Sequence, residues 1–370
     1  MSKINLSIIG SRGYPYVYSG YETFVKELSE RLIHKNYSVK IYCHSKLFSE
    51  KPNAINGIKL VYTPSINNKY FSQIFNSFFS FFHACFSDAD IILVVNSANG
   101  IFGILTKIFR KKTVINVDGL EWKRPKWKGF GKYYFLMSTK LATIFYDQLV
   151  TDSEEMKKIY LNKFNKNSTC IAYGETPKTS NNKKLIEKFK LKKREFYLIV
   201  GRLIPDNNCD LIIKEFIKTE SKKKLVIVGD VPYYDKFVND VKKIKDSRLL
   251  FTGYIKDQHL LNEMYHNCYA YIHGHEFGGT NPTMINALAC STAILALETK
   301  FNEEMLQNYK YGMSFTKENN SLKELINYGE DNDSLMKNYR LKSQAGITEK
   351  FNWENIVNEY SNLFKKTIAN

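Results

Sequence analysis

Short apolar runs alternate with helical patterns along almost the whole chain of 370 residues, and this alternation constrains the fold most strongly. The runs of the first half are INLSIIG (4–10), SVKIYC (38–43), IILVV (91–95), TVINV (113–117) and QLVTD (148–152). A second series comprises FYLIVG (196–201), KLVIVG (224–229), RLLFTG (248–253), AYIHG (270–274) and TAILAL (292–297). Continuous rather than alternating hydrophobicity favours parallel sheets that helices cover on both faces. The sequence therefore predicts two consecutive α/β domains.

A polar stretch separates the two series. GETPKTSNNKK (174–184) is rich in Pro, Gly, Ser, Thr, Asn and Lys and poor in apolar residues, which is typical of a linker. The chain is also too long for one ordinary core. We expect an N-terminal Rossmann-like domain over residues 1–176, a C-terminal one over 177–347, and a terminal helical segment over 348–370.

The chain is basic, with 54 Lys and Arg against 37 Asp and Glu, a net charge of +17. A solvated lysine-rich surface explains most of this charge, and attraction to nucleic acid, an anionic membrane or diphosphate-bearing substrates is the alternative. The six cysteines form no CxxC pair, which indicates free thiols in a reducing compartment. The N-terminus lacks a signal-peptide pattern, and no stretch reaches the ~20 apolar residues of a spanning helix. We expect a soluble protein that touches a membrane at most peripherally.

Four distinctive loops each follow a predicted strand. They are GSRGYPYVYSGYETF (10–24), DGLEWKRPKW (118–127), GRLIPDNN (201–208) and the loop that opens HEFGGTNPTMINALA (275–289). Ligands of open α/β sheets bind beyond the carboxyl ends of the strands, and two such domains facing each other make a cleft. We therefore expect all four loops to belong to one site.

The two later loops suit a diphosphate. HEFGGTNPTMINALA leads a glycine-rich turn into a helix with Pro282 in its first turn, so unpaired N–H groups and the positive end of the helix dipole face an anion. Arg202 follows a strand, and Asn207 and Asn208 lie near the start of the next helix. The cation and amides predict a diphosphate clamp, with a salt bridge plus a helix cap as the alternative.

The two earlier loops suit a sugar or phosphate. Gly10, Gly13 and Gly20 permit a positive φ, and Arg12 offers a planar fork to phosphate, although an ordinary tight turn is the alternative. A carboxylate just past a buried strand, such as Asp118, can orient a hydroxyl or stabilise positive charge at a sugar carbon. The aromatic and basic residues that follow also suit a membrane interface, while core packing is the alternative for the tryptophans.

Two patterns resemble metal sites, and we interpret both otherwise. DAD (88–90) precedes its strand, so we expect a helix N-cap and a surface acid. HGH (273–275) has no third ligand nearby in the sequence, so we expect hydrogen-bonding histidines. We therefore predict no metal and no cofactor. The aromatic helix FSQIFNSFFSFFHACF (71–86) is interpreted as core, with a membrane anchor as the alternative.

Together the loops resemble those of the GT-B glycosyltransferases of family 4, and more closely the bacterial rhamnosyltransferase-like branch that builds cell-surface polysaccharides. GSRGYPYVYSGYETFVKEL, NVDGLEWKR, GRLIPDNN and GGTNPTMINALA carry the resemblance over nearly the whole chain. It implies two Rossmann-like domains facing across a cleft, with the terminal helix around FNWENIVNEY (351–360) crossing back onto the first. It also implies metal-independent transfer with retention of configuration, a nucleotide-sugar donor on the second domain and a lipid-diphosphate-linked acceptor on the first.

The resemblance also assigns residues to roles. The catalytic pair would be Asp118 and Arg202. The donor would be bound by Gly13, Gly20, Asn207, Gly278, Gly279, Thr280, Asn281 and Asn286. The acceptor would be bound by Arg12, Tyr18, Glu22, Glu121, Trp122, Lys123 and Arg124. Gly278 and Asn286 stand where the family carries two glutamates, Asn207 stands at the place of a lysine, and Asp118 appears in place of a histidine.

We predict a retaining hexosyltransferase that moves a deoxyhexose, L-rhamnose from dTDP-L-rhamnose, onto a lipid-linked saccharide at the anionic inner face of the cytoplasmic membrane. We expect no nucleic-acid partner. A deoxyribose has only its 3′-hydroxyl to satisfy, so the single carbonyl acceptor of Asn286 suffices where a ribose would take a carboxylate. The alternatives are a UDP-hexose donor and a catalytically weak binding protein of the same fold. A phosphorylase-like enzyme is disfavoured because no pyridoxal-site lysine motif is apparent.

Overall fold

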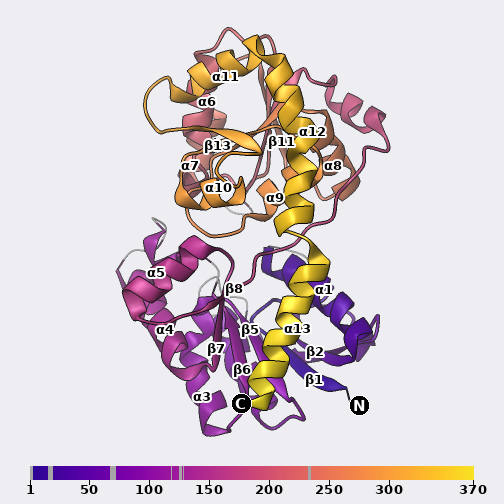
Figure 1. The fold of residues 1–370 in the computed structure, drawn as a ribbon, viewed down its shortest axis with the longest axis vertical. Helices are drawn as coiled ribbons and strands as arrows, with labels where there is room; N and C mark the ends of the chain where they lie inside the picture. Colours follow the sequence, from indigo (N-terminus) through magenta and orange to yellow (C-terminus); the bar gives the residue numbers. More distant parts are fainter. Residues whose placement is uncertain are drawn as a thin grey trace. The chain divides into compact units, whose positions relative to one another are not determined.

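The computed structural model describes residues 3–15, 20–66, 72–117, 119–124, 127, 129–231 and 235–370. The chain divides into two compact units (Figure 1). The first comprises residues 1–173 together with 353–370, and the second comprises residues 174–352.

A parallel sheet forms the centre of the first unit. In the described residues it has eight strands in the order β3-β4-β2-β1-β5-β6-β7-β8, and only the β3–β4 pair is antiparallel. The strands are β1 (Ile4–Ile9), β2 (Tyr37–His44), β3 (Ala54–Ile55), β4 (Ile58–Thr63), β5 (Ile91–Val95), β6 (Thr113–Asn116), β7 (Gln148–Thr151) and β8 (Thr169–Cys170). The chain runs outward from β1 in one direction and from β5 in the other. The loops after β1 and β5 therefore flank the switch point, where such sheets bind ligands.

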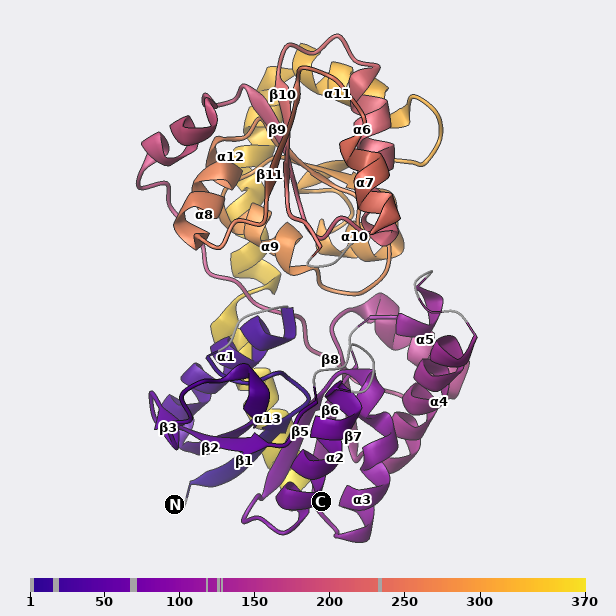
Figure 2. The same cartoon turned by 180° about the vertical axis from the view of Figure 1, so that it is seen from behind.

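Helices flank this sheet, and the last helix of the chain joins them (Figures 1 and 2). They are α1 (Gly20–Leu32), α2 (Ser72–Cys85), α3 (Gly103–Ile108), α4 (Phe130–Phe145), α5 (Glu154–Phe164) and α13 (Trp353–Ala369). Helix α13 packs on the first unit, because the Tyr37 hydroxyl lies 2.9 Å from Ser361 Oγ and Asn116 Nδ2 donates to the Tyr360 hydroxyl at 2.7 Å.

The second unit is built on the same plan. Its sheet has six parallel strands in the described residues, in the order β11-β10-β9-β12-β13-β14, with the switch point between β9 and β12. The strands are β9 (Phe196–Val200), β10 (Lys224–Val228), β11 (Leu249–Gly253), β12 (Ala270–His273), β13 (Ile294–Leu297) and β14 (Gly312–Phe315). The helices are α6 (Cys209–Ile217), α7 (Lys236–Lys242), α8 (Gln258–Asn267), α9 (Pro282–Ala289), α10 (Lys300–Met305), α11 (Ser321–Asp331) and α12 (Asp333–Lys350).

The prediction of two Rossmann-like α/β units with parallel sheets is confirmed, and every strand it named is present. Three parallel strands were not predicted. β4 has an irregular burial pattern near the sheet edge, β8 has two residues, and β14 has the short sequence GMSF. Such strands lack the continuous apolar run that reveals a buried strand. None of the helices in the described part of the chain is long and apolar enough to cross a membrane.

Candidate functional site

In the second unit, the loops that follow β9 and β12 meet at the switch point. Asn208 Nδ2 donates to the Gly274 carbonyl at 2.8 Å, and the Glu276 amide donates to the Asp206 carbonyl at 3.1 Å. A Cβ atom on Gly274 would lie 2.4 Å from the Asn207 carbonyl oxygen, so only glycine allows this approach. The two loops that were predicted to share a site are therefore in contact.

A chain of hydrogen bonds links Arg202, Asn207 and His275. Asn207 Nδ2 donates to the Arg202 carbonyl at 2.7 Å, which turns Asn207 Oδ1 toward His275 Nδ1, 2.7 Å away. Because Oδ1 only accepts, this arrangement assigns the ring hydrogen to His275 Nδ1. The Arg202 side chain is exposed at the carboxyl end of β9. Asn207 thus aligns the loop, while Arg202 supplies its cation.

Both histidines of the HGH motif are hydrogen-bonded to other side chains, as predicted. His273 is buried, and its Nδ1 lies 2.9 Å from the Tyr271 hydroxyl. Burial, and then the neighbouring His275, hold the pKa of His273 well below its ordinary value. His273 therefore stays neutral beneath the loop. His275 lies in the loop itself and is half-buried.

Helix α9 begins as the sequence predicts. Pro282 is its first residue, and the N-cap Asn281 accepts hydrogen bonds through Oδ1 from the Thr283 amide at 3.0 Å and the Thr283 hydroxyl at 2.7 Å. Gly278 has a φ of +124°, which a residue with a side chain rarely adopts. Gly279 and Thr280 complete the buried approach to the helix. The loop and helix start together provide the geometry of an anion site.

The same loop contains a carboxylate that sequence reasoning passed over. Glu276 Oε2 lies 2.6 Å from Lys317 Nζ and 3.4 Å from Asn208 Nδ2. The family's two glutamates are eight positions apart. Aligning the second with Asn286 places the first at Gly278, so Glu276, two residues earlier, was not predicted. The structure places the carboxylate of Glu276 within reach of the loop after β9 and of Lys317, which follows β14.

Asn286 has neighbours that the sequence did not reveal. Its side chain is 8% exposed, its Oδ1 accepts a hydrogen bond from Lys178 Nζ, and its Nδ2 lies 3.4 Å from Asn262 Oδ1. Lys178 also pairs with Glu175 at 3.0 Å. The segment that precedes the second unit's first strand therefore brings a cation onto helix α9.

In the first unit, the loop after β1 is held from several sides. Gly10 has a φ of +108°, and a Cβ atom there would lie 2.2 Å from the Val95 carbonyl oxygen of β5. Gly13 also has a positive φ, and Gly20 is the first residue of α1.

Glu22 and Arg12, which were predicted to bind the acceptor substrate, make hydrogen bonds that hold this loop in place. Glu22 is buried and accepts a hydrogen bond from the Arg12 amide at 3.0 Å. The Arg12 carbonyl in turn accepts from the His44 amide at 3.1 Å. Tyr18 lies outside the described residues, so its assignment stays a prediction.

The loop after β6 is organised around Glu121. Its carboxylate lies 3.0 Å from Arg124 Nε and accepts a hydrogen bond from Trp127 Nε1 at 2.7 Å. Trp122 is 4% exposed and packs edge-on against two aromatic rings of α5, so it belongs to the core, the alternative that sequence reasoning had left open. Lys123 is exposed. Asp118 lies outside the described residues, and its catalytic role stays a prediction.

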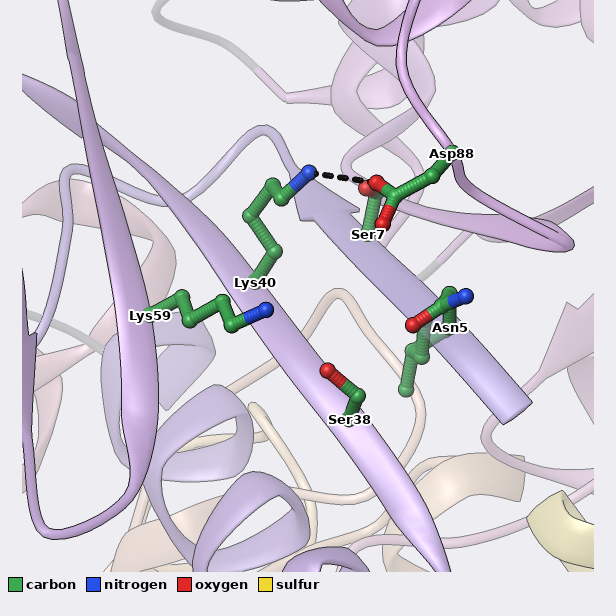
Figure 3. A pocket seen from close by; sticks show the side chains of 7 residues that line it. Asn5, Ser7, Ser38, Lys40, Lys59 and Asp88 are labelled. Carbon is green, nitrogen blue, oxygen red and sulfur yellow. Dashed lines mark hydrogen bonds and ion pairs between the residues drawn. The ribbon is translucent and has the colours of Figure 1, made fainter. Parts of the chain in front are cut away.

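Asp88 of the DAD pattern lies elsewhere, beside the amino-terminal halves of β1 and β2 (Figure 3). Asp88 pairs with Lys40 at 2.9 Å, a hydrogen-bonded contact that lowers the pKa of Asp88. Asp90 accepts a hydrogen bond from the Asn5 amide at 2.7 Å. The predicted helix N-cap is wrong, because the strand β5 follows and Asp90 caps a neighbouring strand instead. The cavity here is about 10 Å³, room for one water molecule.

Comparisons with known proteins agree with this geometry. Residues 180–345 match the family of glycosyl transferases group 1, and residues 89–176 match a domain of unknown function, DUF1972. The second unit contains a group 1 glycosyltransferase domain.

Two curated relatives are similar to this chain. An uncharacterized glycosyltransferase of Methanocaldococcus jannaschii is 26% identical over 396 residues and covers 100% of both chains. The second is the N-acetylgalactosamine-N,N'-diacetylbacillosaminyl-diphospho-undecaprenol 4-alpha-N-acetylgalactosaminyltransferase of Campylobacter jejuni. It is 25% identical over 178 residues, which are 47% of this chain and 48% of that protein.

Solved structures establish the fold. Sucrose-phosphate synthase of Thermosynechococcus elongatus superposes with a TM-score of 0.80 at 15% identity, covering 99% of this chain and 100% of that one. HepE of Anabaena, in complex with UDP and glucose, superposes with a TM-score of 0.78 at 14% identity, covering 98% and 99%. The chain has the GT-B fold, as predicted, and the assignment to group 1 glycosyltransferases is confirmed at that level. The rhamnosyltransferase-like branch stays a prediction.

Proposed function

We propose that the protein is a retaining, metal-independent glycosyltransferase that moves a deoxyhexose from a nucleoside diphosphate onto a lipid-diphosphate-linked saccharide. L-Rhamnose from dTDP-L-rhamnose is the first donor to test, and capsule or another cell-surface polysaccharide is the product class. The protein would work in the cytoplasm, at the inner face of the membrane that holds the acceptor.

One observation carries this proposal: the loops after β9 and β12 join an exposed arginine to a glycine-rich helix start. A leaving diphosphate gains negative charge as the anomeric carbon–oxygen bond breaks. Arg202 and the amides before α9 would oppose that charge. Because the charge is largest in the transition state, this arrangement assists the chemical step as well as binding.

No metal is assigned to this step. In the described residues no three His, Cys, Asp or Glu side chains gather as metal ligands. The protein's own cation and helix start supply the positive charge that a divalent ion would otherwise provide. Turnover in the presence of a chelator tests this assignment.

The acceptor assignment draws support from one relative. The Campylobacter enzyme is named for a diphospho-undecaprenol-linked acceptor. In this chain the loop residues Glu121 and Lys123 of the first unit, with Asp118, would face such an acceptor. We assign Asp118 to the acceptor hydroxyl or to the positive charge at the sugar carbon.

A UDP-hexose is the second candidate donor. HepE was solved with UDP and glucose, which favours this class.

The deciding experiment offers dTDP-L-rhamnose, UDP-glucose and UDP-N-acetylgalactosamine separately, each with a lipid-diphosphate-linked saccharide. We expect release of dTDP and an acceptor enlarged by one deoxyhexose. Transfer from a UDP-sugar alone would replace the first donor by the second. Binding of nucleotides without any transfer would identify a binding protein.

A further inference from the structure

Helix α2 presents polar side chains to the interior of the first unit. Asn76 Nδ2 donates to Thr63 Oγ1 at 2.8 Å, and Ser77 Oγ donates to Asn99 Oδ1 at 2.7 Å. The Ser80 hydroxyl lies 2.8 Å from Thr63 Oγ1. These hydrogen bonds satisfy the buried polar groups, so the inner side of the helix combines polar contacts with buried apolar ones such as Phe81. A surface helix ordinarily docks through its apolar stripe.

The outer side of the same helix carries a phenylalanine stripe, formed by Phe75, Phe78, Phe82 and Phe86. The first three are exposed by 37%, 46% and 51%, and Phe86, just past the helix end, by 65%. Spacings of three and four residues put them on one side of the helix. Together they expose about two whole rings, roughly 300–500 Å². A patch of that size equals the largest apolar patch of a typical monomer, which is often functional.

Helix α3 extends the stripe sideways. The Phe86 ring lies 5.1 Å from that of Phe82 and 4.8 Å from that of Phe109, centroid to centroid. Helices α2 and α3 pack side by side in the first unit (Figure 2). Ile104 and Ile108 of α3 are exposed by 46% and 67%. The apolar surface is therefore continuous across two helices.

Cations border this surface. Lys107 and Arg110 are exposed on either side of Ile108 and Phe109. Lys111 Nζ donates to the Ser87 carbonyl at 2.7 Å, directly after Phe86. Residues 91–117 contain four Lys and Arg and no Asp or Glu. One acid from outside this segment, Asp147, lies 3.7 Å from Lys107 Nζ, so the border is basic on balance. Apolar rings beside lysine and arginine match the layering of a bilayer surface, where acyl chains meet anionic headgroups.

We propose that the phenylalanine stripe and the exposed residues of α3 dock on a bilayer that contains anionic lipid. The rings would enter the boundary between headgroups and acyl chains, and Lys107 and Arg110 would face headgroup phosphates. This inference rests on the proposed function only in that a lipid-linked acceptor lies in a membrane. Of the two segments that the sequence offered as a membrane contact, the aromatic helix and the loop after β6, we assign the contact to the helix, because Trp122 of the loop is buried.

A second copy of the chain fits this surface less well. A two-fold contact brings the same patch of both copies together, so the cations of one copy would lie near the cations of the other. Such like-charge contacts oppose association. An anionic bilayer instead complements both the rings and the cations.

The test is sedimentation of the full chain with vesicles of phosphatidylcholine, alone or mixed with phosphatidylglycerol. We expect binding to the mixed vesicles that weakens as salt rises. The double variant Phe82→Ser/Phe86→Ser should lower the vesicle partition coefficient about 100-fold, since two partly exposed rings no longer enter the bilayer. Leu341→Ser is the matched control, because Leu341 is 75% exposed on α12 of the other unit, and it should bind like the wild type.

A second pair of variants tests the cations. Lys107→Gln/Arg110→Gln should weaken binding to the mixed vesicles and reduce its salt dependence. Lys214→Gln/Lys243→Gln removes two exposed lysines of the second unit and should change neither. Melting temperatures equal to that of the wild type would show that a loss of vesicle binding by a variant does not result from unfolding.

Several results would overturn the proposal. They are no vesicle binding by the wild type, equal binding by the stripe variant, and a wild-type dimer in ultracentrifugation that the stripe variant dissociates. Titration with UDP and dTDP separates this proposal from the donor assignment. Nucleotide binding without vesicle binding refutes only the membrane surface, and vesicle binding without nucleotide binding refutes only the donor site.

Discussion

Replacing Asn286 by Glu changes how many acceptors helix α9 offers to a nucleotide. In the wild type, Lys178 Nζ donates to Asn286 Oδ1, and an amide carbonyl has two lone pairs. One lone pair therefore remains, enough for the 3′-hydroxyl of a deoxyribose. A glutamate brings two oxygens. One would pair with Lys178, and the other would accept from both hydroxyls of a ribose.

The magnitude follows from the burial of this side chain. Position 286 is 8% exposed, so a hydroxyl bonded there is shielded from water. A hydrogen bond to a charged group contributes about 1.5–3 kcal/mol net. Because Lys178 shares the new carboxylate, we expect the lower end of that range, about 1.5 kcal/mol, or roughly a tenfold change in relative affinity.

The assay is calorimetric titration with UDP and dUDP, which differ only in the 2′-hydroxyl. Wild type should prefer dUDP, and Asn286→Glu should shift the ratio toward UDP about tenfold. Asn286→Gln is the control, because it has the length of glutamate without the charge, and it should leave the ratio near the wild-type value. Titration with dTDP then isolates the effect of the thymine methyl group.

Two results would refute this reasoning. If wild type binds UDP and dUDP equally, Asn286 does not read the sugar of the nucleotide. If Gln shifts the ratio as far as Glu does, side-chain length and not acceptor number is responsible. A shift toward dUDP in the Glu variant would reverse the proposed role.

Three further predictions concern the clamp, the metal and a buried histidine. Arg202→Ala should cost about 2–4 kcal/mol of transition-state stabilisation, with kcat falling more than donor affinity; an unchanged kcat in steady-state assays would remove Arg202 from the mechanism. Turnover should survive EDTA, and a loss restored by Mg²⁺ would contradict the metal-independent assignment. Burial, and then Arg12, lower the pKa of His44 from 6.5 to about 4, so the unfolded chain takes up a proton first as the pH falls. His44 should therefore cost up to about 3 kcal/mol of unfolding free energy between about pH 7 and pH 4. In urea unfolding, the free energy of unfolding of His44→Gln should fall less than that of the wild type over this pH range. An equal fall in both proteins would contradict the assignment.

The regular elements were predictable because each leaves a strong local pattern. Strands such as β5 and β10 are buried on both faces, so their apolar runs are continuous. The start of α9 was also predictable, since Asn281 and Pro282 are the residues that a helix start favours. Strand β8 was missed because it has only two residues, and β14 because GMSF contains no continuous apolar run.

The site was predictable only loop by loop. Strand order brings the loops after β9 and β12 together, but the contacts between them depend on side-chain directions that sequence does not carry. Glu276 was missed because the family spacing was counted from Asn286. Lys178 was missed because it lies in the linker, 108 residues from its partner in sequence.

The outer face of α2 is a feature that the sequence could not predict for a different reason. Its sequence is apolar on nearly every side, so the pattern alone predicts burial and cannot say which residues face inward. The structure resolves this, because Asn76 and Ser80 find polar partners on β4 while Phe78 and Phe82 remain exposed. Side-chain partners on a neighbouring strand decide which side of the helix is covered.

The most direct test of the central claim is a transfer assay with dTDP-L-rhamnose and a lipid-diphosphate-linked saccharide, followed by mass spectrometry of the acceptor. We predict an acceptor enlarged by one deoxyhexose, with dTDP released in equal amount and the anomeric configuration of the sugar retained in the product. Failure of transfer from every dTDP- and UDP-sugar, by a protein that still binds nucleoside diphosphates, would contradict it.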